Sequence, residues 1–360
     1  MVTMEPETYN VGILGGTGIV GQRLVRRLEH HPWFRLKALA ASRRSVGKLY
    51  GDAVAWTLGG EPPSYAAGLE VLPCTPEAVT GCDLVFSSLD AAVALVVERS
   101  FSEAGIHVIS NSSAYRMDPA VPLVIPEVNG SHLDLLGMDG GAGGAGHIVT
   151  NPNCSVIGLA IALAPLHQAF GVEAAVVTTL QALSGAGLSG PTPEEMEDNA
   201  LPFIRGEEEK IAAELPKILG RLDRGNGIEP AEIQVSAHCN RIGTVDGHLE
   251  TVSVRLKHKA TPEQAVEKFR QYRGEIEGLD LPSAPARPIV VLDEPDRPQP
   301  KLDRDAGDGM TVVIGRVRTC PVTTLRFSLL SHNTERGAAG AALLNGELMA
   351  SRGMLGRTGS

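Results

Sequence analysis

The chain has 360 residues, a formal net charge of −10 and five cysteines. The length allows two domains, each with its own core. The acidic balance argues against nucleic acid and anionic membrane as partners, although local basic pockets can still bind anionic substrates. The odd cysteine count without paired spacing indicates free thiols in a reducing compartment. The sequence contains no CxxC and no HExxH motif, so it gives no support for a metal site. The opening MVTMEPETYN lacks signal-peptide features, so we expect a cytoplasmic protein.

The first elements predict a nucleotide-binding turn. The apolar run YNVGIL is followed by GGTGIVG and then by QRLVRRLEHH, which has helical spacing. Gly15, Gly18 and Gly21 let the backbone turn sharply, let a pyrophosphate approach the N–H groups, and let the helix pack on the strand. A plain tight turn is the alternative. The strand–turn–helix context favours dinucleotide binding.

The segment after the second predicted strand, FRLKALAA, indicates which dinucleotide is bound. An Asp or Glu there would accept hydrogen bonds from the ribose 2′-OH of NAD. The sequence has SRRSVGK instead, and its Ser42, Arg43, Arg44 and Ser45 suit a 2′-phosphate. We therefore predict NADP, while a solvated surface pair is the alternative for the two arginines.

Further short apolar segments alternate with helical patterns, which predicts a parallel sheet covered on both faces. The segments are GLEVLP, CDLVFSSL and IHVISNSS, with the helical DAAVALVVERSFSEAG between the last two. Ser87, Ser88, Asn111 and Ser112 follow strands, at the edge where such sheets bind ligands. Serine clusters are also common in ordinary turns. We predict a Rossmann-type domain over residues 1–150, with the glycine-rich stretch 137–146 as a flexible insertion.

Cys154 lies in NPNCS, directly before the helix-forming stretch VIGLAIALAPLHQAF. The first N–H groups of a helix lack intrahelical partners and carry partial positive charge, so they stabilise a thiolate. This position predicts a nucleophile; a buried cysteine acting as a small hydrophobe is the alternative. Pro165, His167 and Gln168 interrupt the apolar stretch, which favours a core helix over a membrane span.

The second half predicts an α+β catalytic and dimerisation domain over residues 151–333. The β-rich run VEAAVVTTLQALSGAG contains Gln181, and the helical GEEEKIAAELPKIL places Glu207 and Lys210 on one face, where a solvent-side ion pair is the alternative. Two strands then join near Asp246–Gly247, a strong turn signal. Arg241 and His248 flank this turn. A histidine there is often merely exposed, but a thiol nucleophile needs a base. The strands VVIGRV and TTLRFSLLS follow.

The final segment, TERGAAGAALLNGELMA, predicts a closing helix whose small residues permit close packing. We expect residues 334–360 to return to the first domain.

Together these motifs resemble those of aspartate-β-semialdehyde dehydrogenases, in particular the archaeal and fungal branch. The matching segments span nearly the whole chain in the family's order: ILGGTGIVGQRL, SRRSVGK, ISNSSAYRMDPAVPLVIPEVN, NPNCSVIGL, QALSGAG, EEEK, AHCNRIGTVDGH and HNTERGAAGA. NPNCS and the spacing of Arg241 and His248 are the specific ones. Asp90 stands where relatives commonly have proline, Arg43 where they often have an acidic residue, and the 137–146 insertion is unfamiliar.

The resemblance implies reversible oxidation of aspartate 4-semialdehyde by NADP⁺ with inorganic phosphate, run in reverse for lysine, threonine and methionine biosynthesis. Cys154 would form a thiohemiacetal and then a thioester that phosphate cleaves, with His248 as acid/base. Gln181 would orient the substrate. The other substrate-site residues implied are Asn153 for the oxyanion, Arg241 for the α-carboxylate, Glu207 for the α-ammonium, and Arg116 with Lys210 for phosphate.

The resemblance also implies coenzyme contacts and an oligomer. A homodimer or homotetramer would form on the sheet of the second domain. The implied coenzyme contacts are Gly15, Thr17, Gly18, Ile19, Val20, Ser42, Arg43, Arg44, Ser45, Ser88, Ser184, Gly185, Ala186, Gly187, Leu188 and Asn333.

Three other functions compete with this one. A malonyl-CoA reductase shares the architecture and the cysteine, but a CoA ester would leave Glu207 without a cationic partner. N-acetylglutamyl-phosphate reductases normally have their cysteine in a GCYPT-like setting. A non-catalytic NADP-binding regulator would not need the set of Cys154, Gln181, Arg241 and His248. The remaining cysteines are expected to be structural: Cys74, Cys82, Cys239 and Cys320.

Overall fold

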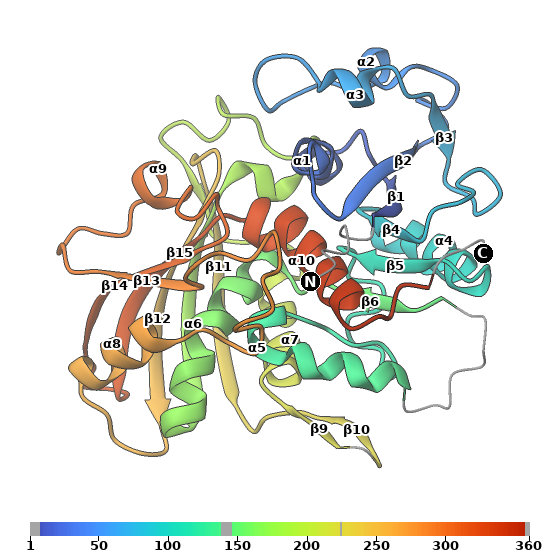
Figure 1. Cartoon of the computed structure of the whole chain (residues 1–360). Helices are drawn as coiled ribbons and strands as arrows, with labels where there is room; N and C mark the ends of the chain where they lie inside the picture. Colours follow the sequence, from blue (N-terminus) through green and yellow to red (C-terminus); the bar gives the residue numbers. More distant parts are fainter. Residues whose placement is uncertain (1–7, 138–145, 224, 357–360) are drawn as a thin grey trace, which may run out of the picture.

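The first half of the chain forms a parallel sheet of the dinucleotide-binding type. In the computed structural model, which describes residues 8–137, 146–223 and 225–356, its strand order is β3-β2-β1-β4-β5-β6 (Figure 1). The order reverses between β1 and β4, and open sheets bind ligands at the carboxyl ends of such strands. The strands are β1 (Tyr9–Leu14), β2 (Phe34–Ala41), β3 (Val71–Pro73), β4 (Leu84–Ser87), β5 (His107–Ser110) and β6 (Ile148–Thr150).

Helices and short turns connect these strands. The longer helices are α1 (Ile19–Leu28), directly after the glycine loop, and α4 (Ala91–Glu103), which Asp90 precedes as its N-terminal cap position. The shorter ones are α2 (Tyr50–Ala53), α3 (Ser64–Ala67), α5 (Pro126–Asn129) and the 3₁₀ segment η1 (Gly130–Gly137). Residues 138–145, which include most of the predicted glycine-rich insertion, lie outside the described residues.

The second half forms a mixed sheet with the order β13-β14-β15-β12-β7-β11-β8. The two strands joined near Asp246–Gly247 form as predicted, but they do not pair with each other. β7 lies between them, parallel to β11 and antiparallel to β12. The strands are β7 (Val172–Gln181), β8 (Ala200–Leu201), β11 (Gln234–Ile242), β12 (His248–Leu256), β13 (Ile289–Leu292), β14 (Val312–Thr319) and β15 (Leu325–Ser331).

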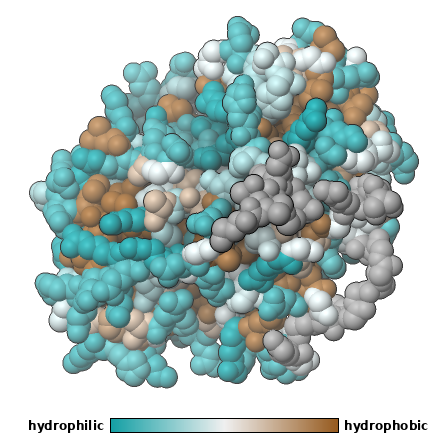
Figure 2. Space-filling view, viewed as in Figure 1, coloured by the Kyte–Doolittle hydropathy of each residue, from teal (hydrophilic) through white to brown (hydrophobic). Residues whose placement is uncertain are grey.

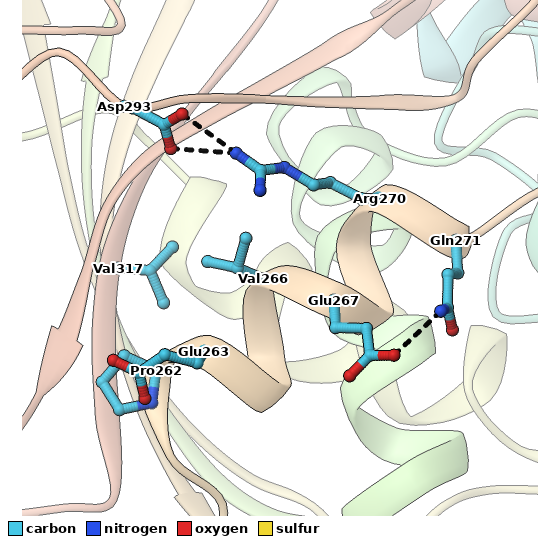
Figure 3. Close-up of a pocket in the computed structure, with 8 residues that line it drawn as sticks. All are labelled: Pro262, Glu263, Val266, Glu267, Arg270, Gln271, Asp293 and Val317. Carbon is cyan, nitrogen blue, oxygen red and sulfur yellow. Dashed lines mark hydrogen bonds and ion pairs between the residues drawn. The ribbon is translucent and has the colours of Figure 1, made fainter.

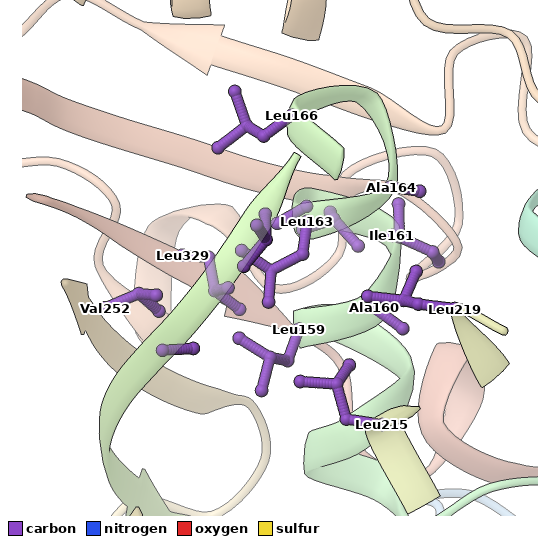
Figure 4. Close-up of a cluster of buried hydrophobic side chains, with 14 of the residues drawn as sticks. Leu159, Ala160, Ile161, Leu163, Ala164, Leu166, Leu215, Leu219, Val252 and Leu329 are labelled. Atoms are coloured by element: carbon purple, nitrogen blue, oxygen red, sulfur yellow. The ribbon is translucent and has the colours of Figure 1, made fainter. Parts of the chain in front are cut away.

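A helix that is apolar all round fills the core beside this sheet. In α6 (Cys154–Phe170), every residue from Ser155 to Leu166 is buried. Figure 4 shows its leucines and alanines against Val252 and Leu329 of the sheet and against side chains of α7 (Glu207–Ile218) and the residue after it. Burial on all sides explains why the stretch is hydrophobic without spanning a membrane. No helix in the described part of the chain has the length and apolarity that crossing a bilayer requires.

The end of the chain returns to the first domain, as predicted. A π-helical turn, η3 (Glu335–Ala339), leads into α10 (Gly340–Ser351), whose Leu343 and Leu344 belong to the core cluster of the first sheet. Figure 1 shows α10 between the two sheets. Arg336 donates two hydrogen bonds of 2.7 Å to the Glu127 carboxylate, and both side chains are fully buried. The boundaries proposed at 150/151 and 333/334 stay predictions.

The remaining elements are peripheral. A small hairpin pairs β9 (Arg221–Asp223) with β10 (Gly227–Glu229). Helix α8 (Pro262–Gln271) carries a Thr261 capping box, and short helices η2 (Leu183–Ala186) and α9 (Pro300–Asp303) lie in loops. Figure 2 shows a mostly hydrophilic surface interrupted by hydrophobic patches. No group of His, Cys, Asp and Glu residues suitable for a metal ion occurs within the described residues.

Candidate active site

Cys154 is the first residue of α6, as the sequence predicted, and its sulfur faces a histidine. The Asn153 side chain caps the helix by accepting hydrogen bonds from the N–H groups of Ser155 and Val156 at 3.0 and 3.4 Å. The sulfur of Cys154 lies 3.2 Å from Nε2 of His248, which is 94 residues further along the chain. A thiol and an imidazole at this distance form the basic unit of thiol-based covalent catalysis.

The strand register of the second sheet brings the other predicted residues to one end of the sheet. Arg241 on β11 pairs with Gln181 on β7, and His248 on β12 pairs with Ser331 on β15. Leu249 pairs with Leu180, so His248 and Gln181 lie at the same end of neighbouring strands. Arg241, Gln181 and His248 are all buried there.

Ala182, directly after β7, fixes two of these side chains through its backbone. Its N–H donates to Nδ1 of His248 at 3.1 Å, and its carbonyl accepts from Nη1 of Arg241 at 2.6 Å. A Cβ atom on Gly185 would lie 2.8 Å from Nη1 of Arg241 and 3.0 Å from Cε1 of His248. A side chain at position 185 would therefore have to displace the Arg241 guanidinium or the His248 ring.

Glu207 at the start of α7 joins the site through three hydrogen bonds. Its carboxylate accepts from Lys210 at 2.8 Å, from the Asn153 amide at 2.8 Å and from the Gln181 amide at 3.3 Å. The predicted pairing of Glu207 with Lys210 on one helix face is present. However, Glu207 is buried among predicted site residues, so a purely solvent-side ion pair does not describe it.

Sequence reasoning missed Glu214 and Lys217, which connect the Arg116 loop to α7. Glu214 accepts from Nη1 of Arg116 at 3.0 Å and from the backbone N–H of Asn153 at 2.6 Å. Lys217 donates to the carbonyls of Arg116, Asp118 and Val121 at 2.8, 2.8 and 2.9 Å. Both lie on one face of α7, three residues apart. The sequence signal that could have found them is helical spacing, which puts both charged residues on the same side of α7 as the apolar Ile211 and Ile218.

The environment shifts the pKa of both central groups toward their neutral forms. Burial and the Glu207 carboxylate raise the pKa of the Cys154 thiol to about 12, against the lowering effect of Arg116, Arg241 and Lys210. Burial and Arg241 lower the pKa of His248 to about 3. At Cys154, burial therefore opposes the stabilisation of a thiolate that the helix terminus is expected to provide.

Glu207 behaves in the opposite way. Burial acts to raise its pKa, but the charge and hydrogen bond of Lys210 and the amides of Asn153 and Gln181 together lower it. These pKa shifts favour an ionised Glu207 carboxylate beside a neutral Cys154 thiol and a neutral His248 imidazole.

The glycine loop between β1 and α1 has the shape needed for a dinucleotide phosphate. Gly15 has a φ of +83°, and a Cβ atom there would lie 2.9 Å from the Ser88 carbonyl oxygen. A Cβ atom on Gly21 would lie 2.4 Å from the Gly15 carbonyl oxygen, so the loop and helix pack without room for side chains. Gly18 caps α1 without a side-chain hydrogen bond, which leaves the first N–H groups of the helix available for an anion.

The other predicted coenzyme residues fall into three groups. Ser42, Arg43 and Arg44 are exposed just after β2, next to the glycine loop in the sheet. The segment from Ser184 to Leu188 lies against the site, with Leu188 exposed. Asn333 is engaged within the chain, because its side chain accepts from the Gly247 N–H and donates to the Ser184 hydroxyl, both at 2.8 Å.

Ion pairs connect helix α1 to the loop before β12 and to η3. Arg23 contacts Asp246 at 3.0 Å and Glu335 at 2.7 Å, and Arg27 pairs with the same Glu335. Asp246 lies two residues before His248. The glycine-loop helix and the thiol–imidazole pair therefore belong to one connected region.

Among the remaining cysteines, Cys239 lies on β11 two residues before Arg241, and the Cys74 thiol donates to the Ala41 carbonyl at the end of β2. Cys82 and Cys239 are buried, and Cys74 and Cys320 are partly exposed. A groove of about 540 Å³ lies beside α8, and Figure 3 shows Arg270 pairing with Asp293 among the residues that line it. None of the predicted site residues lines it.

Comparison with known proteins decides the family. Residues 10–136 match the model described as semialdehyde dehydrogenase, NAD binding domain, and residues 163–336 match semialdehyde dehydrogenase, dimerisation domain. An aspartate-semialdehyde dehydrogenase from Archaeoglobus fulgidus is 48% identical, over 95% of this chain and 98% of its own length. The chain belongs to the aspartate-semialdehyde dehydrogenase family.

Solved structures agree with this placement. The crystal structure of aspartate-semialdehyde dehydrogenase with NADP from Candida albicans has a TM-score of 0.90 and 41% identity, covering 96% of this chain and all of that one. A Vibrio cholerae aspartate-semialdehyde dehydrogenase II complexed with ASA has a TM-score of 0.75 and 26% identity, covering 96% and 98% of the two chains.

Membership in the aspartate-semialdehyde dehydrogenase family gives the general function. The chain is an oxidoreductase of the aspartate pathway with an NAD(P)-binding domain and a dimerisation domain. The predicted resemblance to the archaeal and fungal branch is confirmed, because archaeal and fungal relatives are 41–48% identical over nearly the full length.

Proposed function

We propose that this enzyme oxidises aspartate 4-semialdehyde with NADP⁺ and inorganic phosphate to 4-phosphoaspartate, and catalyses the reverse reaction, through a thioester on Cys154. The observation that carries the proposal is the 3.2 Å separation of the Cys154 sulfur and Nε2 of His248 at the start of α6. The sulfur attacks the carbonyl carbon, and His248 acts at the carbonyl oxygen. Gln181 orients the reacting group, and Asn153 with nearby backbone N–H groups stabilises the oxyanion.

The charges around the thiol support an amino-acid substrate. Arg241 is a buried guanidinium with no acidic hydrogen-bond partner among the described residues, so it is free to bind the α-carboxylate. Glu207 has a lowered pKa, and its carboxylate suits the α-ammonium. A malonyl-CoA substrate would bring no cation to Glu207.

Arg116 and Lys210 form the proposed phosphate site. Lys210 is half-buried and pairs with Glu207, while Arg116 pairs with Glu214. Nε of Arg116 is buried without a hydrogen-bond partner, which leaves one donor for an incoming anion. Loss of a buried donor's partner costs about 1–3 kcal/mol, so binding phosphate here would recover free energy.

NADP is the coenzyme that the residues favour. The phosphate cradle is the glycine loop from Gly15 to Val20 with Ser88, and Ser42 to Ser45 follow β2, where the 2′-phosphate of the adenosine ribose would lie. Arg43 and Arg44 form no ion pair with any described residue. When bound, the coenzyme supplies the hydride acceptor. The segment from Ser184 to Leu188, together with Asn333, would line the nicotinamide end.

The test of this function is a phosphate-dependence assay. NADPH formation from aspartate semialdehyde should require phosphate or arsenate, and NAD⁺ should replace NADP⁺ poorly. Cys154→Ala should abolish turnover while coenzyme binding persists, and Cys320→Ala serves as the matched control at a thiol outside the site. Turnover in Cys154→Ala would contradict the covalent route. Phosphate-independent reduction of malonyl-CoA would favour the rival enzyme, and coenzyme binding without any turnover would favour a regulator.

We also propose a homodimer or homotetramer built on the seven-stranded sheet. Val176 of β7 is 45% exposed, and Phe203 beyond β8 is 67% exposed, although both belong to the dimerisation-domain match. Apolar side chains on a sheet face gain stability when a second copy covers them. Light scattering at several concentrations tests this; a monomer throughout would contradict it.

A further inference from the structure

The guanidinium of Arg116 has two fixed partners. Its Nη1 donates to Oε1 of Glu214 at 3.0 Å, and its Nη2 donates to the Asn111 carbonyl at 2.7 Å. The side chains of Arg116 and Glu214 are both buried. Because a guanidinium is planar, fixing its two terminal nitrogens also fixes the direction of Nε, the remaining donor.

The second oxygen of Glu214 reaches the end of α6 that carries the nucleophile. Oε2 accepts from the backbone N–H of Asn153 at 2.6 Å, and Asn153 caps the helix that begins with Cys154. Hydrogen bonds to an ionised carboxylate are among the strong ones in proteins. One buried carboxylate therefore contacts both Arg116 and the peptide directly before the nucleophile, and it fixes the distance between them.

Lys217, on the same face of α7, holds the backbone of the Arg116 loop. Its ammonium donates to the carbonyls of Arg116, Asp118 and Val121 at 2.8, 2.8 and 2.9 Å, which uses all three of its donors. These contacts fix the main chain of the loop but leave the Arg116 side chain free to rotate. The orientation of the guanidinium therefore depends on Glu214.

A second buried carboxylate, Glu98 of α4, competes for Arg116. Glu98 is completely buried, and its Oε1 accepts from the Ser110 hydroxyl at 2.7 Å. Burial raises the pKa of Glu98, while the hydroxyls of Ser87 and Ser110 and the charge of Arg116 act in the opposite direction. The ion pair that Arg116 forms is with Glu214. Without Glu214, the guanidinium would turn toward Glu98, because an unpaired buried charge is costly.

We propose that Glu214 is the positioning residue of the phosphate site: it holds the Arg116 guanidinium away from Glu98 and at a fixed distance from the peptide before Cys154. The inference rests on the proposed function, in which Arg116 binds inorganic phosphate. Glu214 acts through Arg116 and Asn153. Phosphate bound at Nε of Arg116 then approaches the Cys154 thioester from a constant direction, which rapid attack requires.

Glu214→Gln is the decisive variant, because it breaks one of the two contacts and can keep the other. The amide carbonyl can still accept from the Asn153 N–H, but the amide NH₂ then faces the Arg116 guanidinium, and two donors meet. We expect the KM for phosphate to rise about tenfold to a hundredfold, with the KM values for aspartate semialdehyde and NADP⁺ unchanged. An unchanged KM for phosphate, or equal rises in all three values, would overturn the proposal.

Glu208→Gln is the matched control on the same helix. Glu208 is partly buried and accepts from the backbone N–H of Cys239 at 3.0 Å, so the chemical change is the same, and it forms no hydrogen bond with Arg116 among the described residues. We expect a wild-type KM for phosphate in this variant. A rise equal to that of Glu214→Gln would show general damage to α7 and overturn the proposal.

A second carboxylate variant tests the competition. Adding Glu98→Gln to Glu214→Gln removes the other partner of Arg116, so the KM for phosphate should fall back toward the wild-type value. A KM that stays at the level of Glu214→Gln would overturn the claim that Glu214 keeps Arg116 away from Glu98.

Arg116→Lys separates this inference from the proposed function. Lysine lacks the planar fork, so the KM for phosphate should rise in Arg116→Lys, and adding Glu214→Gln should raise it no further. A further rise would overturn the action of Glu214 through Arg116. A wild-type KM for phosphate in Arg116→Lys would reject the proposed phosphate site and this inference with it. A rise in Arg116→Lys but not in Glu214→Gln would reject this inference alone.

Discussion

Gly337 in η3 packs directly against the nucleophile, so enlarging it should displace Cys154. A Cβ atom at this position would lie 2.8 Å from Cβ and 3.1 Å from Cα of Cys154. Carbon atoms prefer separations of about 3.5–4.0 Å, so Gly337→Ala demands a shift of roughly 1 Å. The opposing atoms belong to the backbone and Cβ of Cys154, which no side-chain rotation can move aside.

The size of the effect follows from this geometry. A misplacement of about 1 Å can lower the rate about 10²-fold, and overpacking of a core costs about 1–3 kcal/mol. We therefore expect Gly337→Ala to lower kcat about 100-fold and to reduce stability modestly, with little change in coenzyme affinity. Steady-state kinetics, thermal unfolding and coenzyme titration measure the three quantities.

Gly346 in α10 provides the matched control. A Cβ atom there would lie 3.1 Å from Cδ2 of Leu84 and 3.2 Å from the ring tips of Phe34 and Phe86, all far ends of side chains in the core of the first domain. Gly346→Ala should lower the melting temperature without the 100-fold loss in kcat. Full activity in Gly337→Ala, at wild-type stability, would refute the close-packing argument.

Three further predictions follow from groups around the site. Because the pKa of Cys154 is raised to about 12, its alkylation by iodoacetamide in the free enzyme should quicken about tenfold per pH unit from pH 6 to 9; a plateau near neutral pH would contradict this. Lys217→Met frees three carbonyls of the Arg116 loop, so the KM for phosphate should rise about tenfold with the KM for semialdehyde unchanged; equal rises in both would point to general damage. Glu250 is buried with both carboxyl oxygens unpaired, and burial raises its pKa well above the usual value. Its contribution to stability is therefore complete below about pH 4.5 and is lost as the pH rises toward the folded-state pKa, by up to about 1.4 kcal/mol per unit. Urea unfolding should show this loss in the wild type and not in Glu250→Gln, and parallel pH profiles would contradict it.

Local sequence patterns were sufficient to predict the first domain. The glycine loop, the helix after it and the alternation of apolar strands are short-range features, and each one has a specific backbone requirement. Cys154 at the start of a helix was visible for the same reason, because Asn153 is a strong cap residue and an apolar helical stretch follows. The resemblance then supplied roles that spacing alone did not.

Long-range pairing and burial could not be read from local patterns. The Asp246–Gly247 turn suggested adjacent strands, but β7 pairs with both of them, and strand insertion depends on contacts far apart in sequence. The backbone of Ala182 carries no side-chain signal at all, yet it orients His248 and Arg241. The helix terminus that favours a thiolate at Cys154 is a local feature, whereas the desolvation that raises the pKa of the thiol depends on the complete fold.

The register of the second sheet explains why the reactive groups can be polar and still be buried. One step below the ends of the strands, Cys239 pairs with Thr179, and Glu250 pairs with both Thr179 and Leu329. Beyond this row the same face carries Val177 and Val252, which pack on α6. Polarity thus decreases along the strands from the site toward the core, and the backbone at their ends supplies the hydrogen bonds. With a neutral His248 imidazole and a neutral Cys154 thiol, only Arg241 and Glu207 remain charged at these strand ends. These protonation states therefore carry the smallest desolvation free energy.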